Sequence, residues 1–533
     1  MIRRFVLPIA AALFAAVAVL SVFAPYLQKD GIWFAWVPLL LLGYFAKPKT
    51  AFWAGWLGGA VHWIISLVWM VKLSENGGPF ALVVLGQGAL GIYMGVYWGV
   101  FTWSVSVLRQ TRLPSLLCTL TEPFLWVACE WIRGYLMGGF PWNFAGVAAL
   151  DYLPFVQSAA IGGVYAVSFL VLLANSAVAA LLRRIAEPFI LRTSGVVQRS
   201  PRILKSLETF IPLAMLLCAW AWGQNRISTW YATERKLPIL TVASVQPASP
   251  CRFSISDSAV AEKRAFLTDQ TETAALTIPD FVIWPETPLF GVFPLDSEVH
   301  QLVRQGVRAG RAPLLTGLLY CEFQNRKPRI YNSAAVFSTN CVMWSLYHKR
   351  HLVPFGEYIP FDKMFPFLQQ FVPAGQSCYP GTTAKTLSIP LPAGPFEVGP
   401  LICYEDTQSY LARDSVRAGA RLLVNLTNDS WFDGSVEPVQ HFHQSVLRAV
   451  ETGVPLIRAA NAGVTGCVSP IGTTTVLSSD GKLDGFSGFW VGRVPKMDVP
   501  FPTIYLSVGN LLLIPPALLL LGVAAAIGFL RPR

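Results

Sequence analysis

Long runs of uncharged, apolar residues constrain this chain more than any other feature of its sequence. A helix needs roughly 20 such residues to cross a hydrocarbon layer of about 30 Å. Runs of sufficient length cover residues 5–24, 51–71, 80–108, 153–182 and 504–530. Shorter runs at 32–46, 113–132 and 209–223 complete the set. The sequence therefore predicts a polytopic α-helical membrane protein with about eight transmembrane helices.

The overall composition supports a membrane protein. Of the 533 residues, 53% are hydrophobic and only 13% are charged, which is too apolar for an ordinary soluble enzyme. Glu122 and Glu130 weaken the run at 113–132 as a span. The first run could instead be a signal peptide, because Arg3 and Arg4 form a basic start. The apolar pattern continues directly after it, however, which favours a retained first helix.

Basic residues are distributed unevenly between the predicted loops. With the amino terminus in the cytoplasm, the inner loops hold clusters of them, whereas the outer loops between spans hold isolated cations such as Lys29, Lys72 and Arg133. The inner set is Arg3, Arg4, Lys47, Lys49, Arg109, Arg112, Arg183, Arg184, Arg192, Arg199, Arg202, Lys205, Arg531 and Arg533. This asymmetry predicts that both termini are cytoplasmic and that residues 224–503 lie outside, in the periplasm of a bacterium. Much of the net charge of +11 thus reflects topology, and no basic-aromatic motif indicates nucleic-acid binding.

The stretch from about 237 to 499 has a different pattern, with polar loops and apolar runs of strand length. Strands are predicted at 239–245, 281–284, 313–319, 334–337, 398–402 and 422–426. Helical patterns between them, clearest at 256–276 and 438–452, indicate an α/β domain. The predicted organisation is seven helices in residues 1–223, an outer catalytic domain in 224–503 and a last helix in 504–533.

Cysteine and histidine spacing gives no sign of a metal centre. The outer domain has neither a CxxC pair nor a His-rich segment. His441 and His443 are two positions apart, so on a helix they point to different faces. Cys321 and Cys341 flank a predicted hairpin and could pair in an oxidising compartment. We therefore predict no metal and no cofactor.

Three segments of the outer domain end in residues suited to acyl transfer. Val398–Ile402 is followed by Cys403, Phe281–Trp284 leads to Glu286, and Lys349 follows a third segment. A thiolate is a nucleophile, a carboxylate can take its proton, and an ammonium group can stabilise an oxyanion. Taken singly, the three would be a core thiol, a turn carboxylate and part of a basic patch. Their shared placement favours a catalytic site.

These segments resemble the catalytic motifs of the nitrilase, or carbon-nitrogen hydrolase, superfamily. The three motifs are residues 284–287 (WPET), 348–357 (HKRHLVPFGE) and 402–405 (ICYE). The chain also resembles the membrane-embedded branch of that superfamily, the apolipoprotein N-acyltransferases, at 428–432 (NDSWF), 440–442 (QHF), 130–133 (EWIR) and 139–142 (GFPW). The likeness extends over nearly the whole chain.

The resemblance implies a periplasmic α-β-β-α sandwich domain with a Glu-Lys-Cys triad. Glu286 would be the general base, Lys349 would stabilise the oxyanion, and Cys403 would carry the acyl group. Supporting roles are implied for Glu357, Glu405 and Tyr404. One departure concerns residues 245–248, which read Val-Gln-Pro-Ala where the family usually has Val-Gln-Gly-Asn. This departure bears on the substrate-facing loop rather than on the triad.

The activity implied by the resemblance is the last step of bacterial lipoprotein maturation at the inner membrane. A phospholipid would donate a fatty acyl chain to the free α-amino group of the diacylglyceryl-cysteine of an apolipoprotein. The reaction would be ping-pong, through a thioester on Cys403, and would need no cofactor or metal. The alternatives are a membrane-tethered amidase or nitrilase acting on a small soluble substrate, and a transporter or assembly scaffold without catalysis.

Overall fold

The computed structural model describes residues 2–192, 206–250, 257–288, 291–359 and 377–530. They form two compact units that alternate along the chain. A helical unit comprises Met1–Val68, Val84–Ser228 and Ser507–Arg533, and an α/β unit comprises Trp69–Val83 and Thr229–Leu506. Some of the predicted inner-loop cations lie outside the described residues, namely Arg199, Arg202, Lys205, Arg531 and Arg533.

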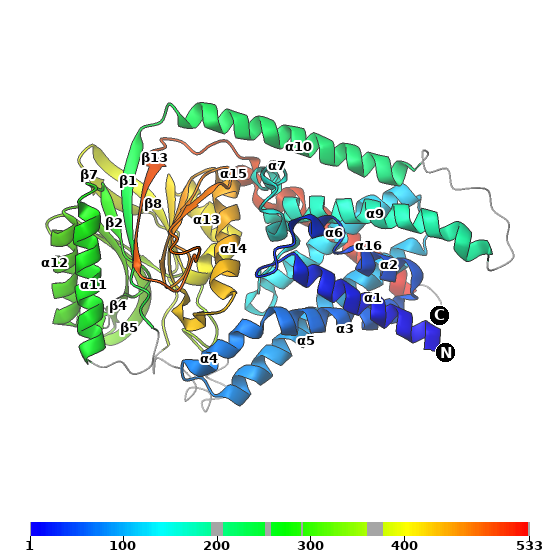
Figure 1. Cartoon of the computed structure of the whole chain (residues 1–533), viewed down its shortest axis with the longest axis horizontal. Coiled ribbons are helices and arrows are strands. Elements are labelled where there is room, and N and C mark those ends of the chain that lie inside the picture. The colour runs from blue at the N-terminus through cyan, green and yellow to red at the C-terminus, as the bar shows by residue number, and fades with distance from the viewer. Residues whose placement is uncertain (1, 193–205, 251–256, 289–290, 360–376, 531–533) are drawn as a thin grey trace. The chain divides into compact units, whose positions relative to one another are not determined.

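The apolar runs form the helices of the helical unit (Figure 1). These are α1 (Ile2–Ser21), α2 (Val37–Phe45), α3 (Pro48–Ser66), α5 (Phe80–Arg109), α6 (Ser115–Tyr135), α7 (Leu153–Val156), α8 (Ala159–Gly162), α9 (Val164–Arg192), α10 (Leu207–Glu234) and α16 (Ile514–Leu530). The predicted run at 153–182 is divided among α7, α8 and α9. The run at 504–530 is divided between α15 (Ile504–Val508) and α16.

Several of these helices are long and apolar enough to cross a membrane, which makes the chain a membrane protein. Within the described residues, Phe80–Arg109, Val164–Ala186 and Ile504–Leu530 meet both requirements. The pair Pro48–Ser66 and Val68–Glu75, bent by 48°, would be a fourth span. The predicted spans at 5–24, 32–46, 113–132 and 209–223 do not meet both requirements. The total of eight therefore stays a prediction.

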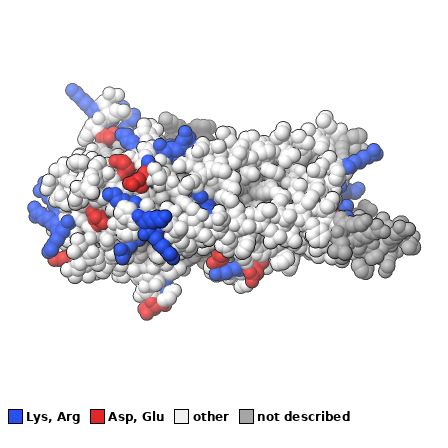
Figure 2. Space-filling model, turned by 90° about the horizontal axis from the view of Figure 1, so that it is seen from above, with Lys and Arg blue, Asp and Glu red and all other residues white. Residues whose placement is uncertain are grey.

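The acidic residue Glu122, which weakened one predicted span, has a partner inside the helical unit. Its side chain is fully buried in α6 and forms an ion pair of 2.7 Å with Arg109 of α5. Tyr44 donates a hydrogen bond of 2.9 Å to the same carboxylate. A charge in an apolar bundle is tolerated when it is paired in this way. On the face drawn in Figure 2, charged side chains are sparse along the helical unit and more frequent on the α/β unit.

The α/β unit is built on two sheets. The first has the order β13-β1-β2-β4-β5-β6, with β3 also paired to β4, and the second has the order β12-β11-β10-β9-β8-β7. The strands are β1 (Ile239–Gln246), β2 (Phe281–Ile283), β3 (Val292–Phe293), β4 (Leu314–Gln324), β5 (Lys327–Phe337), β6 (Met343–His348), β7 (Leu387–Leu391), β8 (Gly394–Ile402), β9 (Leu422–Asn428), β10 (Leu456–Asn461), β11 (Gly466–Val468), β12 (Thr474–Val476) and β13 (Gly488–Pro495).

One hydrophobic core lies between the two sheets and joins residues such as Ile283 and Val336 to Ile402 and Leu426. Helices α11 (Asp257–Ala275) and α12 (Ser297–Gly310) cover the outer face of the first sheet, and α13 (Ser409–Arg417) and α14 (Glu437–Thr452) cover the second (Figure 1). The unit is therefore a nitrilase-like sandwich of helix, sheet, sheet and helix layers. The six strands predicted from the sequence correspond to β1, β2, β4, β5, β8 and β9.

Two details of the α/β unit differ from the sequence-based expectations. Cys321, on β4, and Cys341, in the turn before β6, are both free thiols, so the possible disulfide between them is absent. The segment Trp69–Val83, with the short helix α4 (Lys72–Glu75), leaves the helical unit and belongs to the α/β unit. Asn76 of this segment donates a hydrogen bond of 2.7 Å to the carbonyl oxygen of Trp431.

Candidate active site

The three predicted catalytic residues follow strands that run in the same direction within their sheets. Strand β2 is parallel to β4, and β6 is also parallel to β4 because both are antiparallel to β5. Glu286 follows β2 and Lys349 follows β6. Cys403 follows β8, which lies beside β9 in the parallel trio β8, β9 and β10. Carboxyl ends of parallel strands are where α/β proteins commonly place their sites.

Lys349 is the centre of a buried group of charges. Its side chain is only 1% exposed, and its Nζ lies 2.9 Å from Glu357 Oε2 and 3.5 Å from Glu286 Oε1. A buried ammonium group is strongly disfavoured unless carboxylates surround it. The structure thus brings together Glu286, Lys349 and the supporting residue Glu357.

Asn332 of β5 links the two carboxylates of this group. Its side-chain nitrogen donates to Glu286 Oε1 and to Glu357 Oε1, at 2.7 Å in each case. The backbone carbonyl of the same residue accepts a hydrogen bond of 2.8 Å from the Lys349 amide. Asn332 therefore fixes Glu286, Lys349 and Glu357 relative to one another. Sequence analysis did not identify it, although a polar residue in the apolar run of β5 was a signal.

Cys403 begins the short 3-10 turn η7 (Cys403–Thr407) and has an unusual backbone conformation. Its φ of 50° lies in the left-handed region, which costs a residue with a side chain about 1 kcal/mol or more. The Asn425 amide donates a hydrogen bond of 3.0 Å to the Cys403 carbonyl oxygen. This contact and others in the turn hold the thiol-bearing residue at the end of β8.

Glu405 is a structural anchor for the nucleophile turn. Its fully buried carboxylate accepts hydrogen bonds from the backbone amides of Ile402, Arg350 and His351, at 2.9, 2.6 and 3.1 Å. The Tyr347 hydroxyl lies 3.0 Å from both carboxylate oxygens. Glu405 thereby joins the turn that carries Cys403 to the strand end that carries Lys349.

The remaining predicted supporting residue, Tyr404, is partly buried in the same turn. Its ring stacks on that of His351, with centroids 5.9 Å apart and an interplanar angle of 27°. The contact connects the residue after the nucleophile to the segment after Lys349. Tyr404 thus supports the same junction as Glu405.

Burial and charge together define the protonation of the site. Burial raises the pKa of the Cys403 thiol well above its usual range and Glu286 raises it further, whereas Lys349 lowers it. Burial also raises the pKa of Glu286, although Lys349 opposes the effect. Burial alone would lower the pKa of Lys349, but Glu357 and Glu286 outweigh it and the pKa is raised. The resting site therefore holds a neutral thiol beside a comparatively basic carboxylate and an ammonium group.

Comparisons with known proteins show the family of this chain. Residues 14–177 match the family profile of the apolipoprotein N-acyltransferase N-terminal domain, and residues 241–502 match that of the carbon-nitrogen hydrolases. The apolipoprotein N-acyltransferase of Geobacter metallireducens is 31% identical over 444 residues, which is 83% of this chain and 81% of that protein. The chain belongs to the apolipoprotein N-acyltransferase family.

A second member of this family, from Vibrio vulnificus, is 28% identical and covers 87% of both chains. Among solved structures, an amidase from Nesterenkonia sp. overlaps 51% of this chain and 94% of its own length, with 17% identity and a TM-score of 0.35. The resemblance drawn from the motifs is confirmed. Membership of the family makes the chain an enzyme, an acyltransferase within the nitrilase superfamily.

Proposed function

We propose that this enzyme transfers a fatty acyl chain from a phospholipid to the free α-amino group of the diacylglyceryl-cysteine of an apolipoprotein. The observation that carries the proposal is the buried Lys349 ammonium held between Glu286 and Glu357, three charges that all act on the Cys403 thiol. The relatives named above are apolipoprotein N-acyltransferases, which supports this choice of donor and acceptor. The reaction would complete bacterial lipoprotein maturation.

In the first half-reaction, Glu286 takes the proton from the Cys403 thiol, and the sulfur attacks the ester carbonyl carbon of the phospholipid. The carbonyl oxygen becomes an oxyanion, which Lys349 and the backbone N–H after Cys403 stabilise. The carbon–oxygen ester bond then breaks, and Glu286 returns its proton to the departing oxygen. A lysophospholipid leaves, and the acyl chain remains on Cys403 as a thioester.

In the second half-reaction, the lipoprotein amine attacks the thioester carbon while Glu286 accepts a proton from the nitrogen. The carbon–sulfur bond breaks, the amide forms, and the Cys403 thiolate regains a proton. Every group required for this sequence is provided by the chain, and Glu286 alternates between base and acid. Asn332 and Glu357 hold Glu286 and Lys349 in place through both steps.

The membrane helices suit the proposed substrates, because both carry acyl chains. We place the enzyme in the bacterial inner membrane, with about eight spans, both termini in the cytoplasm and the catalytic domain of residues 224–503 in the periplasm. Both substrates would then reach the site from the outer leaflet.

Transfer rather than hydrolysis requires that water be kept from the thioester until the amine arrives. Apolar side chains close to the motifs are plausible walls for the acyl chain. Phe355 is 63% exposed, whereas Trp431 and Phe432 are partly buried. The Phe432 ring packs against Trp69 with centroids 4.8 Å apart. The segment Trp69–Val83 therefore supports this wall from within the α/β unit.

The decisive experiment gives purified full-length enzyme a phospholipid with no acceptor. We expect about one lysophospholipid per enzyme and a long-lived, hydroxylamine-sensitive acyl adduct, because the first half-reaction stops at the thioester. Adding a diacylated peptide with a free terminal amine should discharge the adduct, and the same peptide with an acetylated amine should not. Continuous release of free fatty acid without an acceptor would instead identify a hydrolase.

A further inference from the structure

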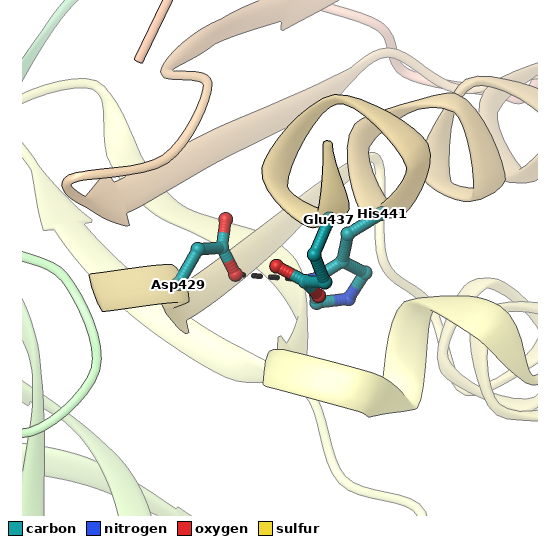
Figure 3. Close-up of side chains that lie close together, drawn as sticks. All are labelled: Asp429, Glu437 and His441. Carbon is teal, nitrogen blue, oxygen red and sulfur yellow. Dashed lines mark hydrogen bonds and ion pairs between the residues drawn. The ribbon is translucent and has the colours of Figure 1, made fainter. Parts of the chain in front are cut away.

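A second group of buried charges lies behind the nucleophile turn. It consists of Asp406 in η7, Asp429 in the 3-10 turn η8 (Asp429–Phe432), His441 on α14 and Arg458 on β10, each at most 2% exposed. We call these four residues the buried charge network. Figure 3 shows the Asp429 carboxylate facing His441, with Glu437 beside the ring on the same helix.

The contacts of His441 define its protonation state. Its Nδ1 lies 3.0 Å from Asp429 Oδ1, and its Nε2 lies 2.9 Å from Asp406 Oδ1. An ionised carboxylate can only accept a hydrogen bond, so both ring nitrogens must donate and the ring is cationic. Burial and Arg458 lower the pKa of His441, but the two aspartates outweigh them and raise it to about 10.

Arg458 provides the second cation. Its guanidinium group donates to Asp406 Oδ2 at 2.5 Å and to Asp429 Oδ2 at 2.9 Å. Burial and the Asp429 charge raise the pKa of the adjacent Glu437 to about 8, so that group is neutral at pH 7. Two anions thus face two cations, and the network has no net charge.

The same residues also offer a set of metal-ligand atoms. Those of Asp429, Glu437 and His441 all lie within 4.8 Å of one another. Both nitrogens of His441 are already hydrogen-bonded, however, and both oxygens of Asp429 accept from protein donors. The network is complete with the chain's own cations, so its role is to be sought in the residues that it contacts.

The network reaches Cys403 through a short chain of hydrogen bonds. Arg458 donates to Asn425 Oδ1 at 3.0 Å, which orients the amide so that its nitrogen faces the Cys403 carbonyl oxygen, also at 3.0 Å. Asp406 belongs to the same turn as Cys403, so Arg458 holds this turn at two points. A residue with φ in the left-handed region persists only when its surroundings hold it there.

The network also acts on Cys403 through its charge. Asp429 is one of the anions that raise the pKa of the thiol, together with Glu286 and Glu357, while Lys349 lowers it. An unbalanced negative charge at Asp429 would therefore make the thiol harder to ionise. The positive charges of His441 and Arg458, which both contact Asp429, compensate its negative charge.

We propose that Arg458 and His441 are positioning residues for acyl transfer: they hold the strained turn of Cys403 through Asn425 and Asp406, and they neutralise the two aspartates behind the thiol. This inference rests on Cys403 being the nucleophile of the proposed function. It assigns a role to a polar network that lies beside the Cys403 turn.

The test measures alkylation of Cys403 by iodoacetamide as a function of pH in the full-length enzyme, with the Cys403 peptide quantified by mass spectrometry. His441→Gln removes a cation and should move the midpoint up by about one pH unit, because an unbalanced anion disfavours the thiolate. Asp429→Asn removes an anion and should move it down. The double variant restores the balance of charge and should return the midpoint close to that of the wild type.

His300→Gln on α12 is the matched control and should leave the midpoint unchanged. Shifts of the same sign in the two single variants, or no shift in either, would overturn the electrostatic role. If His441→Gln does not fold, the downward shift of the alkylation midpoint in Asp429→Asn tests the electrostatic role by itself. Alkylation does not depend on acyl transfer, so a failure of the proposed function would leave these shifts intact.

Arg458→Lys separates positioning from charge. Lysine keeps the positive charge but lacks the planar guanidinium group, whose several N–H donors bind Asp406, Asp429 and Asn425 at once. We expect the midpoint of alkylation to be unchanged. Acyl-enzyme formation should be slower by about tenfold or more, because one hydrogen bond to a charged group is lost. An unchanged rate of acyl-enzyme formation would overturn the positioning role.

Discussion

The side-chain amide of Asn332 and the Glu286 carboxylate are joined by a buried hydrogen bond of 2.7 Å. The same amide nitrogen also donates to Glu357, so one NH₂ group serves two carboxylates. An amide has two hydrogens and can satisfy both partners at once. The spacing between the carboxylates of Glu286 and Glu357 is therefore set by the Asn332 amide.

Replacing Asn332 with aspartate should disable the site while changing its shape little. The new side chain would put a third carboxylate between Glu286 and Glu357 and would remove both donated hydrogens. Hydrogen bonds to charged groups contribute about 1.5–3 kcal/mol each, so acyl-enzyme formation should slow by about 100-fold or more. Asn325→Asp, in the exposed turn between β4 and β5, is the matched control and should keep its activity. Equal activity in both variants would contradict this role.

The identity of the nucleophile can be read from the acyl adduct. Cys403→Ala should form no hydroxylamine-sensitive adduct with phospholipid, whereas Cys467→Ala, at another partly buried free cysteine, should form it normally. Glu286→Gln and Lys349→Ala should reduce the rate of adduct formation by about 100-fold or more, since each removes a proton acceptor or an oxyanion partner. An adduct that persists in Cys403→Ala would place the nucleophile elsewhere.

The stability of the enzyme should depend on pH through His441. Its pKa is about 10 in the folded protein and has an ordinary value of 6.5 when unfolded. The stabilisation from its proton is therefore fully present below pH 6.5 and is lost as the pH rises through about 10. In detergent, the melting temperature of the wild type should exceed that of His441→Gln most at pH 6, and the gap should narrow by pH 10. A constant gap would show that His441 is not a buried cation.

The predicted topology can be tested with reporter fusions. A reporter active only in the periplasm should be silent after Arg533 and active when inserted after Asn325, in the exposed turn of the α/β unit. The physical basis is the excess of Lys and Arg in the predicted inner loops. Strong activity after Arg533 would require an odd number of spans.

Much of the fold followed from local patterns in the sequence. An apolar run as long as Phe80–Arg109 forms a helix, because every backbone N–H and C=O group within the hydrocarbon needs a hydrogen-bond partner in its own segment. Strands such as β1 and β8 are short apolar segments whose residues fill the core between the sheets. Bending was not predictable in this way: the apolar run at 51–71 breaks near Ser66, and the segment after Val68 packs with the α/β unit.

The sequence by itself predicted the chemistry of this protein, because Glu286, Lys349 and Cys403 occur in motifs that resemble those of the carbon-nitrogen hydrolases, and each motif follows a strand. Only the tertiary structure decided what controls them. Asn332 and Arg458 stand inside ordinary apolar strands, and nothing in their local sequence shows which carboxylates they contact. Those partners lie up to 52 residues away along the chain and meet only when the strands pack, since the energies of buried charges depend on three-dimensional neighbours rather than on spacing.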